Sequence, residues 1–284
     1  QQQFINGNAM ILKNRTYLIT GIADEHSLAM YAAKAIISEG GKVICTGLGV
    51  SSFHQNLSER AKAYLNKTFD DFRESIKIHL GNKASTEILD VTLDENIEFF
   101  ANDLLKKNIN IDGILHAVAM DKTIRNKKVK PLLEVSLNEF CETLDVSAFS
   151  LIRLTNSLFK SGVLNPGASI CALSYIAAEK VTFHPYRNMS IAKAALERIV
   201  IELADEMGRH NGTRVNAIRF STYLGSKAGA ATLTEEDVST SDRISPLGNA
   251  TPSDLANEVV HLFRPDSRIT GEIRHVDGGY HIMG

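Results

Sequence analysis

The sequence predicts an α/β domain in which helices cover both faces of a parallel sheet. Short apolar segments alternate with longer segments of helical periodicity over most of the chain. The apolar segments are nearly continuous, as expected for strands that are buried on both sides. No internal repeat or linker divides the chain, so we expect one domain over residues 10–284. Residues 1–9 precede Met10 and are expected to be an expression remnant outside that domain.

The chain begins with a strand, a tight turn and a helix. The apolar run 17–20 ends at Gly21, and a helical pattern follows over 27–39. Two glycines at 40–41 close this helix, and a second strand is expected at 42–46. This unit is the one that begins a sheet of parallel strands joined by helices.

The same alternation continues along the chain and makes the predicted sheet doubly wound and Rossmann-type. Further strands are expected at 75–80 with 87–89, at 113–117, 169–173 and 214–218, and ending at Val276. Further helices are expected at 57–67, 94–107, 136–159, 189–207 and 252–263. The polar stretch 219–243 lacks clear periodicity, and we interpret it as a substrate-binding lid, with a plain surface insertion as the alternative.

Composition and charge limit the possible partners. The formal net charge is −2, so no global field would recruit nucleic acid or an anionic membrane surface. The apolar runs are shorter than the roughly 18 residues that a membrane helix needs. The three cysteines form no CxxC pair and are expected to be reduced, which indicates a cytoplasmic protein. We therefore expect a small ligand, held by local features of the fold.

The first turn is a candidate site for the pyrophosphate of a nicotinamide dinucleotide. A glycine turn before a helix offers backbone N–H groups and a positive dipole end to an anion. We assign this role to Gly21, Ile22, Ser27 and Leu28. An ordinary strand-ending turn, with Ser27 as a helix cap, is the alternative.

Three later strand ends supply further candidates for the cofactor site. We expect Asp90 with Val91 at the adenine and Ala117 with Val118 at the ribose. Helix capping by the aspartate and tight packing at the alanine are the respective alternatives. The turn after the second strand, which ends at Leu48, has neither an acid for the ribose diol nor an arginine for a 2′-phosphate. We therefore expect NADH, with NADPH as the alternative.

A tyrosine and a lysine supply the candidate chemistry. Tyr186 precedes a predicted helix and Lys193 lies about two turns along it, so both can face one cleft. An ammonium near a phenol is expected to lower its pKa, and it can also bond the ribose hydroxyls. Tyr223 and Lys227 have the more common Tyr-x3-Lys spacing, but they lie beyond the sixth strand, and we expect no catalytic role for that pair.

Together these residues resemble the enoyl-acyl-carrier-protein reductases of bacterial type II fatty acid synthesis, a divergent branch of the short-chain dehydrogenases. That family uses Gly-x5-Ser-(Ile/Leu)-Ala in place of the usual glycine triplet, and Tyr-x6-Lys in place of Tyr-x3-Lys. It also has an outer tyrosine in a Ser-Tyr-(Leu/Ile)-Gly-Ala-Glu stretch. The matching segments are Gly21 with 27–29, Tyr186 with Lys193, Tyr175 within 174–179, the Asp-Val-Ser at 145–147, and 275–281. The gap between the two tyrosines is one residue longer than is usual in the family.

Three departures from the family affect the expected cofactor and acyl sites. Where the family has Ser-Ala-Gly-Pro-Ile-x-Thr, this chain has residues 219–225, so Thr222 and Tyr223 take positions expected to face the cofactor. Residues 117–119 read Ala-Val-Ala in place of Ser-Ile-Gly. The charged Asp121 falls near the expected acyl site, where an apolar chain would not favour it.

The resemblance implies hydride transfer from NADH or NADPH to the β-carbon of a trans-2-enoyl thioester on acyl carrier protein. Tyr186 would hold the enolate oxygen, Lys193 the nicotinamide ribose, and Tyr175 would line the thioester end. The resemblance also implies a homotetramer paired through the fourth and fifth helices. One alternative is a short-chain dehydrogenase that acts on a carbonyl or alcohol. The other is a protein that binds a dinucleotide or an acyl carrier without turnover.

Overall fold

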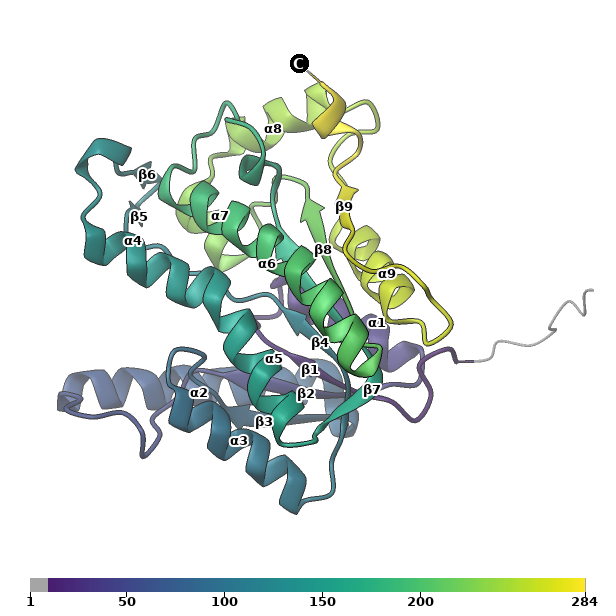
Figure 1. The fold of residues 1–284 in the computed structure, drawn as a ribbon. Coiled ribbons are helices and arrows are strands. Elements are labelled where there is room, and N and C mark those ends of the chain that lie inside the picture. Colours follow the sequence, from purple (N-terminus) through teal and green to yellow (C-terminus); the bar gives the residue numbers. More distant parts are fainter. Residues whose placement is uncertain (1–9, 284) are drawn as a thin grey trace, which may run out of the picture.

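The computed structural model describes residues 10–283, and its centre is a seven-stranded parallel sheet (Figure 1). The strand order is β3-β2-β1-β4-β7-β8-β9. The strands are β1 (Thr16–Ile19), β2 (Lys42–Gly47), β3 (Ala84–Ile88), β4 (Ile111–His116), β7 (Leu164–Ser174), β8 (Arg214–Phe220) and β9 (Ile273–Val276). The chain moves outward from β1 in one direction and from β4 in the other, so a crevice opens at the carboxyl ends of this central pair. The predicted doubly wound, Rossmann-type sheet is confirmed.

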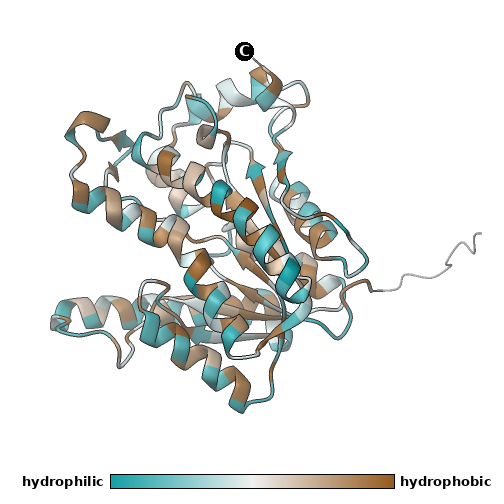
Figure 2. Cartoon of the chain, in the orientation of Figure 1, coloured by the Kyte–Doolittle hydropathy of each residue, from teal (hydrophilic) through white to brown (hydrophobic). Residues whose placement is uncertain are grey.

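Two helical layers bury the two faces of the sheet. One layer comprises α1 (Leu28–Ser38), α2 (Glu59–Leu80) and α9 (Pro252–Phe263). The other comprises α3 (Asp94–Lys106), α5 (Ser150–Lys160) and α6 (Asn188–Asn211). Hydrophobic and hydrophilic stretches alternate along α3 and α6 in Figure 2, as expected for helices with one buried side. The core therefore forms as two apolar clusters separated by the sheet.

One predicted strand is wrong. Residues 75–80 are the last turns of α2, and the third strand of the sheet is β3. Phe72, Ile76 and Leu80 are buried at a spacing of four residues, so the apolar side chains that suggested a strand form the buried stripe of a helix. A short apolar run does not distinguish a strand from a helix, whereas the spacing of the buried residues over a longer segment does.

The helix predicted at 136–159 contains a wide turn. α4 (Leu137–Leu144) passes through a π-helical turn at Asp145–Phe149 into α5. Within this turn, the Ser147 hydroxyl accepts a hydrogen bond from the Met120 N–H at 3.0 Å. Ser150, directly after it, lies 2.7 Å from Nε2 of the buried His116. The turn thus connects the second helical layer to the loop that follows β4, and π-turns of this kind occur frequently at functional sites.

The segment 219–243 has regular structure that its periodicity did not reveal. After β8 it forms α7 (Lys227–Thr232) and α8 (Glu235–Ile244), which begin at the side-chain caps Ser226 and Thr234. α7 is only six residues long, too short for its periodicity to stand out. A small hairpin of β5 (Ile124–Arg125) and β6 (Lys128–Val129) contacts α7. Over residues 10–283, the helices are too short or too polar to cross a membrane.

Candidate active site

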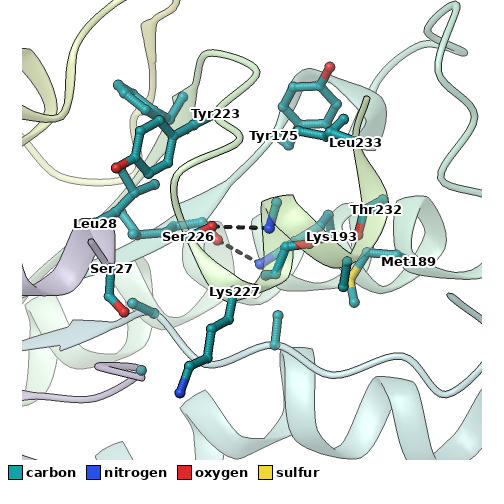
Figure 3. A pocket seen from close by; sticks show the side chains of 18 of the residues that line it. Ser27, Leu28, Tyr175, Met189, Lys193, Tyr223, Ser226, Lys227, Thr232 and Leu233 are labelled. Carbon is teal, nitrogen blue, oxygen red and sulfur yellow. Dashed lines mark hydrogen bonds between the residues drawn. The ribbon is translucent and has the colours of Figure 1, made fainter. Parts of the chain in front are cut away.

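A cavity of about 350 Å³ opens at the carboxyl ends of the central strands. Its walls come from the turn after β1, the loop after β4, the end of β7, the start of α6 and the segment 220–233. Figure 3 shows Ser27 and Leu28 on one wall, with Lys193 and Met189 of α6 and Thr232 and Leu233 of the 220–233 segment around the same space. Ligands of doubly wound sheets bind at this position.

The turn after β1 lies directly against the end of β4. Gly21 has φ +80°, and a Cβ atom added there would lie 2.3 Å from the carbonyl oxygen of Ala117. The Thr20 hydroxyl donates to the Leu115 carbonyl at 3.0 Å and accepts from the Ala117 N–H at 3.1 Å, which fixes the two strand ends together. Sequence reasoning missed Thr20, because its partners are about a hundred residues away in the chain.

Ser27 organises the turn and does not cap the helix. Its hydroxyl accepts hydrogen bonds from the N–H groups of Ala23 at 2.9 Å and Asp24 at 3.0 Å. It forms no side-chain bond with the first turn of α1. The helix N-terminus therefore faces the cavity without a side-chain cap, which is the arrangement that suits an anionic group.

The three candidate catalytic residues lie together on the cavity wall. The rings of Tyr175 and Tyr186 are 5.2 Å apart between centroids and inclined by 50°. The Tyr175 hydroxyl is 3.2 Å from the Thr222 hydroxyl, and the Lys193 ammonium donates to the carbonyl of Leu173 at 2.8 Å. Residues from the end of β7, the start of α6 and the end of β8 thus meet at one place.

Burial dominates the acid–base properties of this group. It raises the pKa of Tyr175 to about 12 and raises the pKa of Tyr186 still further. Burial also lowers the pKa of Lys193 to about 8, against the opposing effect of Glu197. The expectation that Lys193 lowers the pKa of the Tyr186 phenol is wrong, because desolvation of the phenol outweighs any effect of the ammonium. Both phenols are therefore protonated near neutral pH and can donate hydrogen bonds.

Comparisons with known proteins identify the family of the chain. The family model described as "Enoyl-(Acyl carrier protein) reductase" matches residues 21–281. The chain belongs to this family. It is 33% identical over 276 residues to the NADH enoyl-acyl-carrier-protein reductase FabI of Aquifex aeolicus, covering 96% of this chain and 94% of the relative. The Rickettsia prowazekii FabI is 31% identical over 289 residues, covering 96% and 97%.

Solved structures of family members superpose closely on this fold. The Alistipes finegoldii FabI–NADH complex has a TM-score of 0.82 at 27% identity, covering 97% of this chain and 90% of that one. The Bacillus cereus reductase with NADP⁺ and indole naphthyridinone has a TM-score of 0.81 at 28% identity, covering 96% and 99%. The resemblance inferred from the motifs is thus confirmed over nearly the whole chain.

A buried ionic cluster lies beside the tyrosines. Its central residue, Arg219, takes the position of the serine that begins the family's Ser-Ala-Gly-Pro-Ile-x-Thr stretch. Arg219, at the end of β8, is 6% exposed and donates to both carboxylate oxygens of Glu197, from Nε at 2.8 Å and from Nη2 at 2.6 Å. The same guanidinium bonds Glu179 and lies 3.1 Å from Nε2 of His275. Ser174 donates to Glu197 at 2.6 Å. The cluster connects β7, β8, β9 and α6, and sequence spacing gave no sign of it.

The adenine-side candidates lie outside the cavity. Asp90 accepts hydrogen bonds from the N–H and hydroxyl of Thr92 at 2.9 and 2.6 Å, and its other oxygen lies 3.1 Å from Nε2 of His54. The backbone N–H of Ser51 donates to Nδ1 of His54, so Nε2 carries the hydrogen and donates to Asp90. His54, which sequence reasoning missed, thus occupies one side of the Asp90 carboxylate.

The remaining candidates lie on the cavity wall, in the core or, for Leu48, at the surface. Gly21, Ser27, Leu28, Ala117, Thr222 and Tyr223 line the cavity. Ile22 and Val91 are buried, Val118 packs against the core under the second helical layer, and Leu48 is exposed after β2. Asp121 lines the cavity as expected; one carboxylate oxygen accepts from the Thr123 N–H at 2.8 Å. Its other oxygen is buried and lacks a hydrogen-bond partner within residues 10–283.

The segment 220–233 contacts the turn after β1. The Tyr223 hydroxyl donates to the carbonyl of His26, and the Lys227 ammonium donates to the carbonyl of Ala23, each at 3.1 Å. These two side chains, which have the Tyr-x3-Lys spacing, thus bind the turn after β1. Figure 3 shows them on the same side of the cavity as Ser27 and Leu28.

The close approach at Gly21 can be tested with a matched pair of substitutions. Gly162 also has positive φ, at +75°, but no other atom of residues 10–283 lies within 4 Å of an added Cβ. Gly21→Ala is expected to lower the free energy of unfolding by about 2 kcal/mol more than Gly162→Ala, because overpacking a closed site costs roughly 1–3 kcal/mol. Urea unfolding measures the free energy of unfolding of both variants. Equal losses would contradict the close approach of Gly21 to Ala117.

Proposed function

We propose that this chain reduces the trans-2 double bond of enoyl thioesters carried on acyl carrier protein, with NADH as the hydride donor. The proposal rests on the buried, protonated phenols of Tyr175 and Tyr186. They line the same cavity as Lys193 and the turn at Gly21. Membership of the family and the activities in the names of the Aquifex and Rickettsia relatives support it.

The residues at the strand ends fit a dinucleotide. Because Gly21 has no Cβ, the turn lies directly against the carbonyl of Ala117, and the N-terminus of α1 lies beside it. We propose the pyrophosphate at Gly21, Ile22, Ser27 and Leu28. We propose that Leu48, Asp90 and Val91 contact the adenine side of the cofactor. We propose that the ribose and nicotinamide side is contacted by Ala117, Val118, Lys193, Thr222 and Tyr223. NADH is favoured over NADPH because the turn at Gly47–Leu48 has no basic side chain for a 2′-phosphate.

The cofactor, when bound, supplies a hydride to the β-carbon of the substrate. Tyr186 donates a hydrogen bond to the thioester oxygen, where negative charge develops as the hydride adds. The resulting enolate then takes up a proton from solvent at its α-carbon, which completes the reduction. Because burial keeps this phenol protonated, the donor is in place before the reaction begins. The Lys193 ammonium orients the ribose hydroxyls, and Tyr175, held by Thr222, lines the thioester end.

A second candidate function is reduction of a carbonyl, or oxidation of an alcohol, on a more polar substrate. The unpartnered oxygen of Asp121 in the cavity wall favours it, since an apolar acyl chain would leave that carboxylate without a donor. A protein that only binds dinucleotide or carrier would not need two buried phenols and a lysine at one point. We place the reaction in the cytoplasm, because the three free thiols suit a reducing compartment.

Replacing the proposed hydrogen-bond donor tests the mechanism. Tyr186→Phe is expected to lower kcat with crotonyl thioesters about 10²- to 10³-fold, because one preorganised donor to a developing oxyanion is lost. The NADH dissociation constant should stay within about twofold, since the ribose contacts belong to Lys193. Steady-state NADH absorbance and fluorescence titration measure the two quantities.

Tyr64→Phe is the control for that substitution, because Tyr64 is exposed on α2. It should leave kcat unchanged. If the wild-type protein oxidises neither NADH nor NADPH with any enoyl thioester, the proposed activity is refuted.

The charge of Lys193 should appear in the pH profile. With a pKa of about 8, Lys193 is an ammonium below that pH and neutral above it, while both phenols stay protonated throughout this range. We expect kcat/KM for NADH to fall as the pH rises through about 8. In Lys193→Arg the fall should move to higher pH, because a guanidinium keeps its proton. A profile that is the same in both proteins would assign the titration to another group.

We propose a homotetramer paired through α4 to α6. Exposed apolar side chains gather on these helices, including Leu137 and Phe149 at 78% and 46% exposure, and Ile191 and Ile201 on α6. Sedimentation velocity should therefore give about four times the mass of one chain. A monomer at micromolar concentration would contradict the assembly.

A further inference from the structure

The extra residue between the two tyrosines lies in a stretch that contains a buried histidine. His184 is 9% exposed, and its backbone carbonyl accepts a hydrogen bond from the Thr182 hydroxyl at 2.5 Å. Its ring meets the ring of Tyr186 edge-on, with centroids 5.4 Å apart and planes at 79°. His184 does not line the cavity, so it can influence the reaction only through its neighbours.

The imidazole is held by a carboxylate from the first turn of α8. Nδ1 of His184 lies 3.3 Å from Oδ2 of Asp237, and both side chains are largely buried. A carboxylate only accepts, so Nδ1 carries the hydrogen of this contact. Nε2 is buried and has no partner within residues 10–283, which leaves Asp237 as the polar anchor of the ring.

Asp237 is itself fixed by the helix that carries it. Its Oδ2 accepts hydrogen bonds from the N–H of Thr234 at 2.8 Å and from the Thr234 hydroxyl at 2.7 Å, which forms the capping box of α8. Burial raises the pKa of Asp237, but the bonds from Thr234 and His184 outweigh it and bring the pKa below its usual value. The carboxylate is therefore charged, and its position follows that of α8.

We propose that His184 is a positioning residue, and that the Asp237–His184 contact couples the seating of α8 to the placement of the Tyr186 ring. The inference rests on the proposed function. The connection runs from α8 through Asp237 and His184 to Tyr186, whose ring lies against that of Tyr175. Moving the first turn of α8 thus moves the side chain that supports the phenol of Tyr186. A displacement of about 1 Å at such a group can cost up to 10²-fold in rate.

The chain offers a matched control for this contact. Asp254 forms the same capping box at the start of α9, accepting from the Thr251 N–H at 2.8 Å and its hydroxyl at 2.7 Å, without a histidine partner. Asp237→Ala and Asp254→Ala therefore remove the equivalent half of a helix capping box, and only the first removes the link to His184. His184→Phe keeps a ring beside Tyr186 and removes the polar contact with Asp237.

Steady-state kinetics with NADH and crotonyl thioester give the first test. We expect Asp237→Ala and His184→Phe each to lower kcat about 10-fold with the NADH dissociation constant unchanged, and the double variant to lose no more than either alone. Asp254→Ala should stay within about twofold of the wild type. In a Tyr186→Phe background, Asp237→Ala should cause no further loss. An equal loss in Asp254→Ala, or an additional loss without the Tyr186 hydroxyl, would overturn the proposal.

A second readout does not depend on turnover. The ¹³Cζ NMR signal of Tyr186, assigned by its disappearance in Tyr186→Phe, should shift in Asp237→Ala and in His184→Phe and stay in place in Asp254→Ala. An unmoved signal in the first two variants would overturn the coupling even if the enzyme is active. Wild-type protein without activity but with the expected shifts would refute the proposed function and leave the coupling standing.

Discussion

The contact between the ends of β1 and β4 is the constraint on which the site depends. Thr20 bonds both Leu115 and Ala117, and Gly21 passes so close to the Ala117 carbonyl that a side chain would not fit. This closeness directs the chain into α1 with the helix N-terminus facing the crevice. The other walls of the cavity, from β7, α6 and the segment after β8, are positioned relative to these two strands by the sheet.

Exclusion of water then determines the chemistry of the site. Burial makes the phenols poorer acids and the lysine a weaker base, so the phenols stay neutral while Lys193 loses its charge only above about pH 8. Neutral phenols suit a reaction in which charge appears on a substrate oxygen, because they donate without carrying competing charge. The charged groups of the neighbouring cluster are paired with one another, since Arg219 bonds both Glu197 and Glu179.

The sequence predicted what depends on periodicity and on short spacing. The strand–helix alternation, the Gly21 turn and the seven-residue step from Tyr186 to Lys193 were all found in this way. The end of α2 was mistaken for a strand because six apolar-rich residues fit both structures. The pKa of Tyr186 was predicted in the wrong direction, because a spacing shows which groups are neighbours and does not show how deeply they are buried.

Contacts between distant segments could not be predicted. Arg219 meets Glu197, Glu179 and His275 at separations of 22, 40 and 56 residues, and no local pattern marks such pairs. His54 reaches Asp90 across 36 residues, which changed the expected adenine contact from a free carboxylate to a shared one. These residues became visible only when the fold placed their side chains together.

The short helix after β8 has a thermodynamic consequence. A six-residue helix is not stable alone, so the order of α7 derives from its packing, including the bonds of Tyr223 and Lys227 to the turn after β1. That turn is also where the dinucleotide is proposed to bind. By linkage, if ligand binding favours the ordered segment by some factor, then ordering the segment beforehand tightens ligand binding by the same factor. Cofactor affinity in this protein therefore reports on the folding equilibrium of α7 as well as on the contacts of the nucleotide itself.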